Sequence, residues 1–209
     1  MATAQRHIIP ESKPYRWTRE EYYKMGEIGF FEDKRVELIE GEVIEMSPIY
    51  SPHTTSVTLV GEVLREIFGK GWVVREEKPL SLGINSDPEP DVALVAGKIR
   101  DFEESHPSTA ALVIEVVDSS LSYDRNRKAS LYAKAGIADY WVVNLQDRQI
   151  EVHRRPISDA NAEFGFSYGD KMIFKEGDSV KPLAKPKASI EVSDLLPQSV
   201  SKPKEKDNA

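Results

Sequence analysis

The stretch ALVIEVV, residues 111–117, holds one carboxylate in a run of otherwise apolar residues. Continuous apolar runs of this length are typical of strands that are covered on both faces. An ionised carboxylate in such an interior costs several kcal/mol unless a cation, a hydrogen-bond network or a metal ion compensates it. Glu115 is therefore a candidate functional residue that needs a partner.

A second carboxylate, Asp91, follows Pro90 at the entrance of another apolar segment, residues 91–97. If the two strands pair side by side, Asp91 and Glu115 can point to the same face of a sheet. Two carboxylates at contact distance repel each other unless a proton or a cation lies between them. Because oxygen ligands without a nearby His or Cys favour a hard divalent ion, we expect this pair to bind Mg²⁺ or Mn²⁺.

A lysine on the following helix can complete this site. Asp124, Lys128 and Leu131 are spaced i, i+4 and i+7, which places them on one stripe of an α-helix. If Leu131 faces the sheet, Lys128 faces it as well and lies close to the carboxylates. An amine in that position could orient an attacking water or stabilise charge that develops on a phosphate in the transition state.

Each of these residues also has a simpler interpretation. Glu115 could reach solvent or pair with an arginine, Asp91 could be a turn or capping residue, and Lys128 could be a solvated helix residue. Glu37 fits an exposed strand carboxylate as well as it fits a member of the site. For His53 a local hydrogen bond at a helix N-terminus is favoured over a contact with the site. The combination supports the site better than any single residue does.

The remaining candidates add little. Tyr140 and Trp141 are expected in the core of the sheet, not stacked on bases. Arg125, Arg127 and Lys134 could face phosphates, although a basic helix face is usually solvated. The sequence contains no glycine-rich dinucleotide loop, Walker A loop, H-E-x-x-H or G-x-S-x-G motif, so no rival catalytic motif competes.

Composition sets further bounds. The 209 residues suit one domain with a substantial core, and the absence of cysteine excludes disulfides, thiolate metal sites and cysteine nucleophiles. A net charge of −7 argues mildly against strong non-specific binding of nucleic acid. The sequence has no apolar run long enough for a signal peptide or a membrane span, so we expect a cytoplasmic protein without a membrane part.

The element pattern predicts a mixed α/β domain whose main sheet is flanked by helices, with additional hairpins. Residues 1–14 are expected to form an N-terminal arm, 15–197 the domain, and 198–209 a disordered tail. The expected elements are, in order, a helix capped by Thr18 and Glu21, a hairpin around Glu40 and Gly41, a helix over 53–70, strands over 72–83, 91–97 and 111–117, a helix over 123–135, a hairpin over 139–155, and short later strands.

The segments EPDVALV, LVIEVVDSS and DRNRKASLYAKAGIADYWVVNL, preceded by RVELIEGEVIEMSP, resemble the Uma2 family of the PD-(D/E)XK nuclease superfamily over about residues 17–196. The resemblance implies a restriction endonuclease-like core in which Asp91 and Glu115 are the acidic residues of the motif and Glu37 is a further acidic position. It also implies metal-dependent hydrolysis of DNA phosphodiesters. The third motif position is Val117, so the lysine must come from elsewhere, and Lys128 is the natural candidate.

Two hypotheses follow from this pattern. The first is an endonuclease that binds Mg²⁺ or Mn²⁺ through Asp91 and Glu115, with Lys128 and Glu37 as catalytic residues. The second is a catalytically silent nuclease-like fold that serves as a binding or assembly module, which Val117 and the acidic net charge favour somewhat. A homodimer would suit cleavage of both strands of a duplex.

Overall fold

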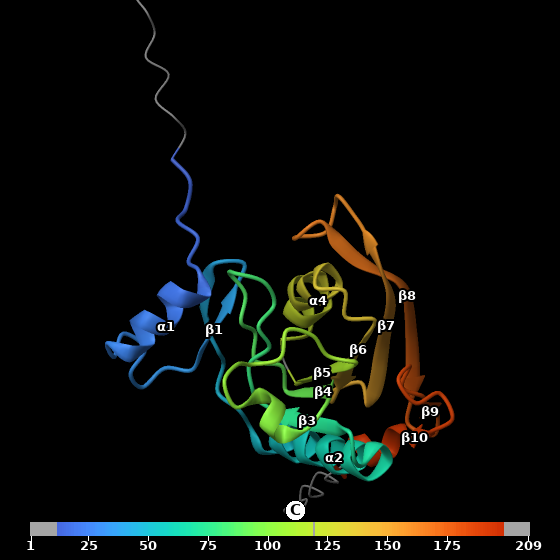
Figure 1. Cartoon of the computed structure of the whole chain (residues 1–209). Coiled ribbons are helices and arrows are strands. Elements are labelled where there is room, and N and C mark those ends of the chain that lie inside the picture. Colours follow the sequence, from blue (N-terminus) through green and yellow to red (C-terminus); the bar gives the residue numbers. More distant parts are fainter. Residues whose placement is uncertain (1–11, 119, 199–209) are drawn as a thin grey trace, which may run out of the picture.

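The centre of the molecule is a six-stranded mixed sheet (Figure 1). The structure, a computed structural model, describes residues 12–118 and 120–198. Across the sheet the strands are β3 (Trp72–Glu76), β4 (Val92–Ala96), β5 (Leu112–Val117), β6 (Asp139–Asn144), β7 (Gln149–Ser158) and β8 (Phe166–Lys175). Of these, β5 and β6 are parallel and all other neighbours are antiparallel.

Helices cover both faces of this sheet, which confirms the predicted mixed α/β class. The long helix α2 (Ser51–Phe68) lies on one face and α4 (Ala129–Lys134) on the other (Figure 1). The buried residues Val57, Val60 and Leu64 of α2 recur at helical spacing and pack on the sheet. A second apolar layer forms between the sheet and α4.

The alternation of β5 explains how a glutamate fits into an apolar strand. Leu112, Ile114 and Val116 belong to the core on the α2 side, whereas Val113 and Val117 belong to the core on the α4 side. Because side chains alternate between the faces of a strand, Glu115 points to the α4 side. The helix that carries Lys128 covers that same side.

A two-stranded hairpin and a helix lie beside the sheet. The helix α1 (Arg19–Glu27) has the predicted capping box of Thr18 and Glu21. The hairpin consists of β1 (Val36–Ile39) and β2 (Glu42–Glu45), and both turn residues, Glu40 and Gly41, have positive φ, as a tight primed turn requires. An isolated bridge from Leu38 to Asp87 attaches β1 to the segment that leads into β4, and so brings Glu37 toward the sheet.

The helix predicted over residues 123–135 begins two residues earlier and is not uniform. It starts as α3 (Leu121–Tyr123), widens into a π-helical turn, η2 (Asp124–Lys128), and continues as α4. A π turn inserts an extra residue into the helix, and such turns are frequent at functional sites. The first and last residues of η2 are Asp124 and Lys128, and both are buried. The π-helical geometry thus directs these two charged side chains toward the sheet.

The C-terminal part departs most from expectation. The hairpin predicted to end at residue 155 extends further, because β7 and β8 are both ten residues long. The sequence signal for β8 is weak because it is an edge strand whose residues 169–173 are exposed. After it come β9 (Ser179–Val180), β10 (Ile190–Glu191) and η3 (Val192–Leu195), and the hydroxyl of Ser56 in α2 donates to the carbonyl of Leu195.

The predicted arm at residues 1–14 and the predicted tail at 198–209 fall almost entirely outside the described residues. A further short 3₁₀ helix, η1 (Ile99–Phe102), follows β4.

In the part of the chain that the structure describes, none of the helices combines the length and the apolar character of a membrane span.

Candidate active site

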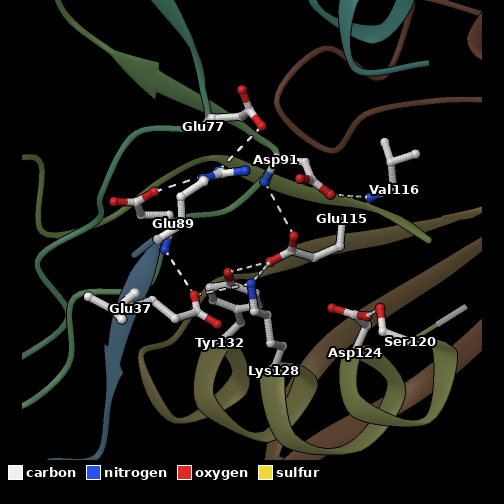
Figure 2. Close-up of polar contacts among 12 residues, drawn as sticks. Glu37, Glu77, Glu89, Asp91, Glu115, Val116, Ser120, Asp124, Lys128 and Tyr132 are labelled. Atoms are coloured by element: carbon white, nitrogen blue, oxygen red, sulfur yellow. Dashed lines mark hydrogen bonds and ion pairs between the residues drawn. The ribbon is translucent and has the colours of Figure 1, made fainter. Parts of the chain in front are cut away.

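Asp91 and Glu115 are joined where the β4–β5 ladder ends (Figure 2). In this ladder Val92 pairs with Ile114, so the next opposite positions are Asp91 and Glu115. The amide of Asp91 donates to Glu115 Oε2 at 3.2 Å, and the amide of Val116 donates to Asp91 Oδ2 at 2.6 Å. Glu115 thus accepts from the amide of Asp91, and Asp91 accepts from the amide that follows Glu115, which fixes both side chains at the same end of the strand pair.

Lys128 lies between two glutamates. Its Nζ is 3.1 Å from Glu115 Oε1 and 3.2 Å from Glu37 Oε2. The hydroxyl of Tyr132, one helical turn further on, donates to the same oxygen of Glu115 at 2.7 Å (Figure 2). The apolar run of β5 therefore tolerates Glu115 because an amine and a phenol from the covering helix compensate its charge.

Glu37 is a buried member of this cluster, which excludes its interpretation as an exposed strand carboxylate. Its Oε2 also accepts a hydrogen bond from the amide of Glu89 at 3.1 Å, which ties β1 to the chain just before Asp91 (Figure 2). The hairpin contributes Glu37 to the cluster, the strand pair contributes Asp91 and Glu115, and the helix contributes Lys128. Lys128 is therefore not a solvated helix residue, and Glu115 neither reaches solvent nor pairs with an arginine. Asp91 accepts its backbone hydrogen bond from the neighbouring strand, so it is not merely a local turn or capping residue.

The burial of these groups shifts their protonation. Burial raises the pKa of Glu115 well above its ordinary value, Lys128 opposes this effect, and the charge of Asp91 adds to it. For Lys128 burial alone would lower the pKa, but the nearby carboxylates of Glu115 and Glu37 outweigh burial and raise it well above the usual range. The amine is therefore charged at neutral pH, and the carboxylates around it outnumber it.

Asp124 adds a further carboxylate from the π turn. Its Oδ2 accepts a hydrogen bond from the hydroxyl of Ser120 at 2.9 Å (Figure 2). Burial raises the pKa of Asp124 to about 6, while Lys128 and the bond from Ser120 oppose the shift. The site thus has more carboxylates than its single amine can neutralise, and the remaining carboxylates are either ionised or protonated.

The sequence favours a local hydrogen bond for His53, and this prediction is wrong. Nε2 of His53 lies 3.2 Å from Asp91 Oδ2, so the first turn of α2 reaches the site. Burial alone would lower the pKa of His53, but the hydrogen bond and the charge of Asp91 raise it. The sequence signal was weak because 38 positions separate the two residues, 91 minus 53, and no local pattern connects them.

These groups lie in a cleft of about 350 Å³. Its volume is in the range of small-molecule and cofactor sites. Tyr123 also lines the cleft, and within the described residues its buried hydroxyl has no hydrogen-bond partner. The other lining residues come chiefly from β2 and the loop after it and from the segment between β5 and the helix, and include Arg35, Met46, Ile49, Tyr50, Asp118 and Ser120.

The carboxylates of the cleft can serve as ligands of a divalent cation. No group of three or more His, Cys, Asp and Glu side chains within residues 12–118 and 120–198 is arranged to hold a metal ion. Magnesium, however, usually keeps several waters and takes only one or two carboxylates from a protein. Asp91 and Glu115 fit that requirement, and the excess of carboxylates over amines in the cleft favours a further cation.

The other sequence candidates lie outside the cleft. Tyr140 and Trp141 are fully buried in the sheet, as expected. Each basic side chain of the helix pairs with a carboxylate: Arg125 with Glu151, Arg127 with Glu42 and Glu163, and Lys134 with Glu40. These three side chains are therefore not a free basic face.

Comparisons with known proteins agree with this architecture. The model of the family Uma2, described as "Putative restriction endonuclease", matches residues 19–191. A solved structure from Anabaena variabilis ATCC 29413, titled a putative nuclease belonging to DUF820, is similar with a TM-score of 0.64 and 16% identity, over 86% of this chain and 97% of that chain. At that identity the likeness concerns the fold alone. No curated protein matches the chain.

Proposed function

Because the chain belongs to the Uma2 family of restriction endonuclease-like proteins, we propose that it hydrolyses phosphodiester bonds of DNA with the help of Mg²⁺ or Mn²⁺. The observation that carries the proposal is the meeting of Asp91, Glu115 and the buried amine of Lys128 in one cleft. Carboxylates and an amine in this arrangement suit the hydrolysis of a phosphate ester.

Asp91 and Glu115 would hold the cation. Its contribution, when bound, would be Lewis acidity that activates a water molecule and offsets the charge of the phosphate. The cross-strand hydrogen bonds fix the two carboxylates in advance, so little side-chain entropy is lost when they act as ligands. The surplus of carboxylates over amines supports the binding of such a cation.

Lys128 would act on the reacting groups directly. Its Nζ is fixed by Glu115 and Glu37, and its raised pKa keeps it charged. A fixed positive charge in a partly enclosed cleft stabilises charge that develops on a phosphate oxygen more strongly than the same charge in water. Glu37, predicted as catalytic from the sequence, would then work as a positioning residue that holds the amine.

One observation favours a second candidate function, a nuclease-like fold that binds without cleaving. Lys128 already sits between Glu37 and Glu115 and neutralises part of their charge without any metal. Such a module would keep the fold and the cleft but would not need a cation. The cytoplasmic location and the homodimer stay predictions.

The test is cleavage of plasmid and single-stranded DNA in Mg²⁺, in Mn²⁺ and in chelator. We expect cleavage by the wild type only with metal, and a loss of at least about 100-fold in Asp91→Asn and in Glu115→Gln. Asp170→Asn is the matched control, because Asp170 is an exposed carboxylate that pairs with Arg155 on β8. This control should cleave like the wild type.

Thermal unfolding with and without Mn²⁺ separates the two functions. A cation that binds only the folded protein raises the midpoint of unfolding, and the rise should disappear in Asp91→Asn. A metal-dependent rise without cleavage of any substrate supports the silent module. If the wild type shows no cleavage and no rise in its unfolding midpoint at millimolar Mn²⁺, the proposal of a metal-dependent nuclease is contradicted.

A further inference from the structure

A second cavity, of about 450 Å³, lies on the other side of the same helical segment. It is bounded by the helix start on one side and by β7 and β8 on the other, and we call it the β7–β8 pocket. Its lining residues are Ser122, Arg125, Asn126, Glu151, His153, Lys171, Met172 and Ile173. In the register of the two strands His153 is opposite Lys171 and Glu151 is opposite Ile173, so these four side chains share one face.

His153 is the buried polar group of this pocket. It is 2% exposed, and among the described residues neither ring nitrogen has a hydrogen-bond partner. Its ring packs between Tyr140 and Tyr168, with centroid distances of 5.5 and 5.9 Å. Buried nitrogens without a partner are uncommon in folded proteins and indicate a bound water, ion or ligand group. A ligand in the pocket would supply that partner.

The charges of the pocket indicate the sign of such a ligand. Glu151 already accepts hydrogen bonds from Arg125, Asn144 and Gln149, so its negative charge is compensated within the protein. Lys171 adds a positive charge beside His153. Burial lowers the pKa of His153 to about 4, and Lys171 and Arg125 lower it further while Glu151 opposes them. The imidazole is therefore neutral and the balance around it is positive.

We propose that the β7–β8 pocket binds a phosphate-class oxyanion through Lys171 and the imidazole of His153, with the guanidinium of Arg125, which pairs with Glu151, at the edge of the pocket. Ser122 and Asn126 provide a hydroxyl and an amide at the exposed edge. The oxyanion is either a phosphate of a nucleic-acid strand or a free phosphate ester. The pocket shares one helical segment with the candidate active site, since Tyr123, Asp124 and Lys128 face the cleft. The proposal does not rest on cleavage activity.

Two ligands distinguish the sources: inorganic phosphate and a short single-stranded oligonucleotide. Both are measured with chelator present, so that neither metal binding nor cleavage enters the result. The variant is Lys171→Gln, and the matched control is Lys175→Gln, an exposed lysine on the same strand four residues later. Both lysines are exposed on an edge strand, so both variants should fold like the wild type.

With inorganic phosphate, we expect a rise in the unfolding midpoint of the wild type and of Lys175→Gln, and a smaller or absent rise in Lys171→Gln. The imidazole resonances of His153 should move on addition of phosphate, whereas those of His106 should not. With the oligonucleotide, Lys171→Gln should weaken binding about tenfold and reduce the slope of log affinity against log salt by about 1.

If phosphate raises the unfolding midpoint but Lys171→Gln does not weaken binding of the oligonucleotide, the ligand of the pocket is a free phosphate ester. An effect on the oligonucleotide assigns it to a nucleic-acid strand. If neither ligand shifts the His153 resonances or distinguishes Lys171→Gln from Lys175→Gln, the proposed site is wrong. None of these readouts depends on a cleavage reaction, so a failure of the nuclease proposal is seen separately.

Discussion

The amine of Lys128 lies 3.1 Å from a carboxylate oxygen of Glu115, and both side chains are at most 6% exposed. One comes from a helix and the other from the strand that this helix covers. The third position of the acidic motif that the sequence resembles is Val117, which is buried in the core on the α4 side. The helix thus delivers the amine while the strand keeps an apolar side chain for packing.

The first prediction concerns the stability of this buried pair. Lys128→Met should lower the free energy of unfolding by about 3 to 5 kcal/mol near neutral pH, because Glu115 and Glu37 would remain buried without their cation. Adding Glu115→Gln to that variant should restore part of the loss, since it removes one of the stranded charges. Urea unfolding of the two single variants and the double variant measures the coupling. Additive losses would show that the two side chains do not interact.

The second prediction concerns the hydroxyl of Tyr123 in the cleft. Burial raises the pKa of Tyr123 to about 12, so the phenol is protonated and can donate to a phosphate oxygen. Because this hydroxyl has no partner among the described residues, Tyr123→Phe should leave the stability unchanged or raise it by up to about 1 kcal/mol. Cleavage of DNA, measured as kcat/KM, should fall about tenfold, by the loss of one hydrogen bond to a charged group.

Tyr168→Phe is the control for this variant. The hydroxyl of Tyr168 donates to the buried carbonyl of Ile137 at 2.8 Å, and neither residue lines the cleft. Removal of this hydroxyl should lower the free energy of unfolding by about 1 to 2 kcal/mol and leave kcat/KM of the folded enzyme unchanged. If Tyr123→Phe destabilises as much as Tyr168→Phe and cleaves normally, Tyr123 has only a structural role.

The third prediction compares the contributions of a buried and an exposed carboxylate to the free energy of unfolding. Asp139, at the start of β6, is fully buried and accepts hydrogen bonds from Trp141 Nε1, Arg154 Nε and the amide of Leu183, each at 2.8 Å. Asp139→Ala should lower the free energy of unfolding by about 3 kcal/mol or more, because it leaves these donors and a guanidinium without a partner.

The exposed pair of Asp170 and Arg155 provides the comparison. Pairs of this kind contribute between zero and about 1 kcal/mol, so Asp170→Ala should change the free energy of unfolding by less than about 1 kcal/mol. Denaturant unfolding of both variants at the same pH checks the difference. Equal losses would mean that burial of Asp139 does not set its contribution.

The sequence predicts those parts of the molecule that are determined by residues close to one another along the chain. The capping box of Thr18, the turn at Glu40 and Gly41 and the apolar runs around Asp91 and Glu115 each depend on neighbouring residues. The pairing of the two strands, which was a condition of the predicted site, is present in the structure. The family resemblance supplied the grouping of Glu37 with Asp91 and Glu115, which lie on different elements.

The parts that sequence reasoning missed depend on contacts between distant segments or on departures from regular geometry. His53 meets Asp91 only because α2 crosses the end of the sheet. The i, i+4 spacing of Asp124 and Lys128 assumes a regular α-helix, and no sequence signal marked the π turn. The exposed residues of β8 lack the apolar alternation that identifies a strand, because a sheet edge can be solvated.

The fourth prediction concerns acid stability and His153. The pKa of this residue falls from 6.5 to about 4 in the folded protein, chiefly because it is buried. Between these values the unfolded chain binds a proton that the folded protein does not. The contribution of His153 is therefore complete above about pH 7 and is lost as the pH falls toward 4, by about 3 kcal/mol in total.

His153→Gln removes this titration and keeps a polar side chain of similar size. Compared with the wild type, the variant should lose less stability on acidification, so the difference between the two free energies of unfolding should change by about 3 kcal/mol between pH 7 and pH 4. The raised pKa of Asp124 works in the opposite direction, because the folded protein then binds more protons than the unfolded chain, but it is common to both proteins and cancels in the difference. Urea unfolding at several pH values measures the difference, and a value that stays constant with pH would show that His153 keeps an ordinary pKa in the folded state.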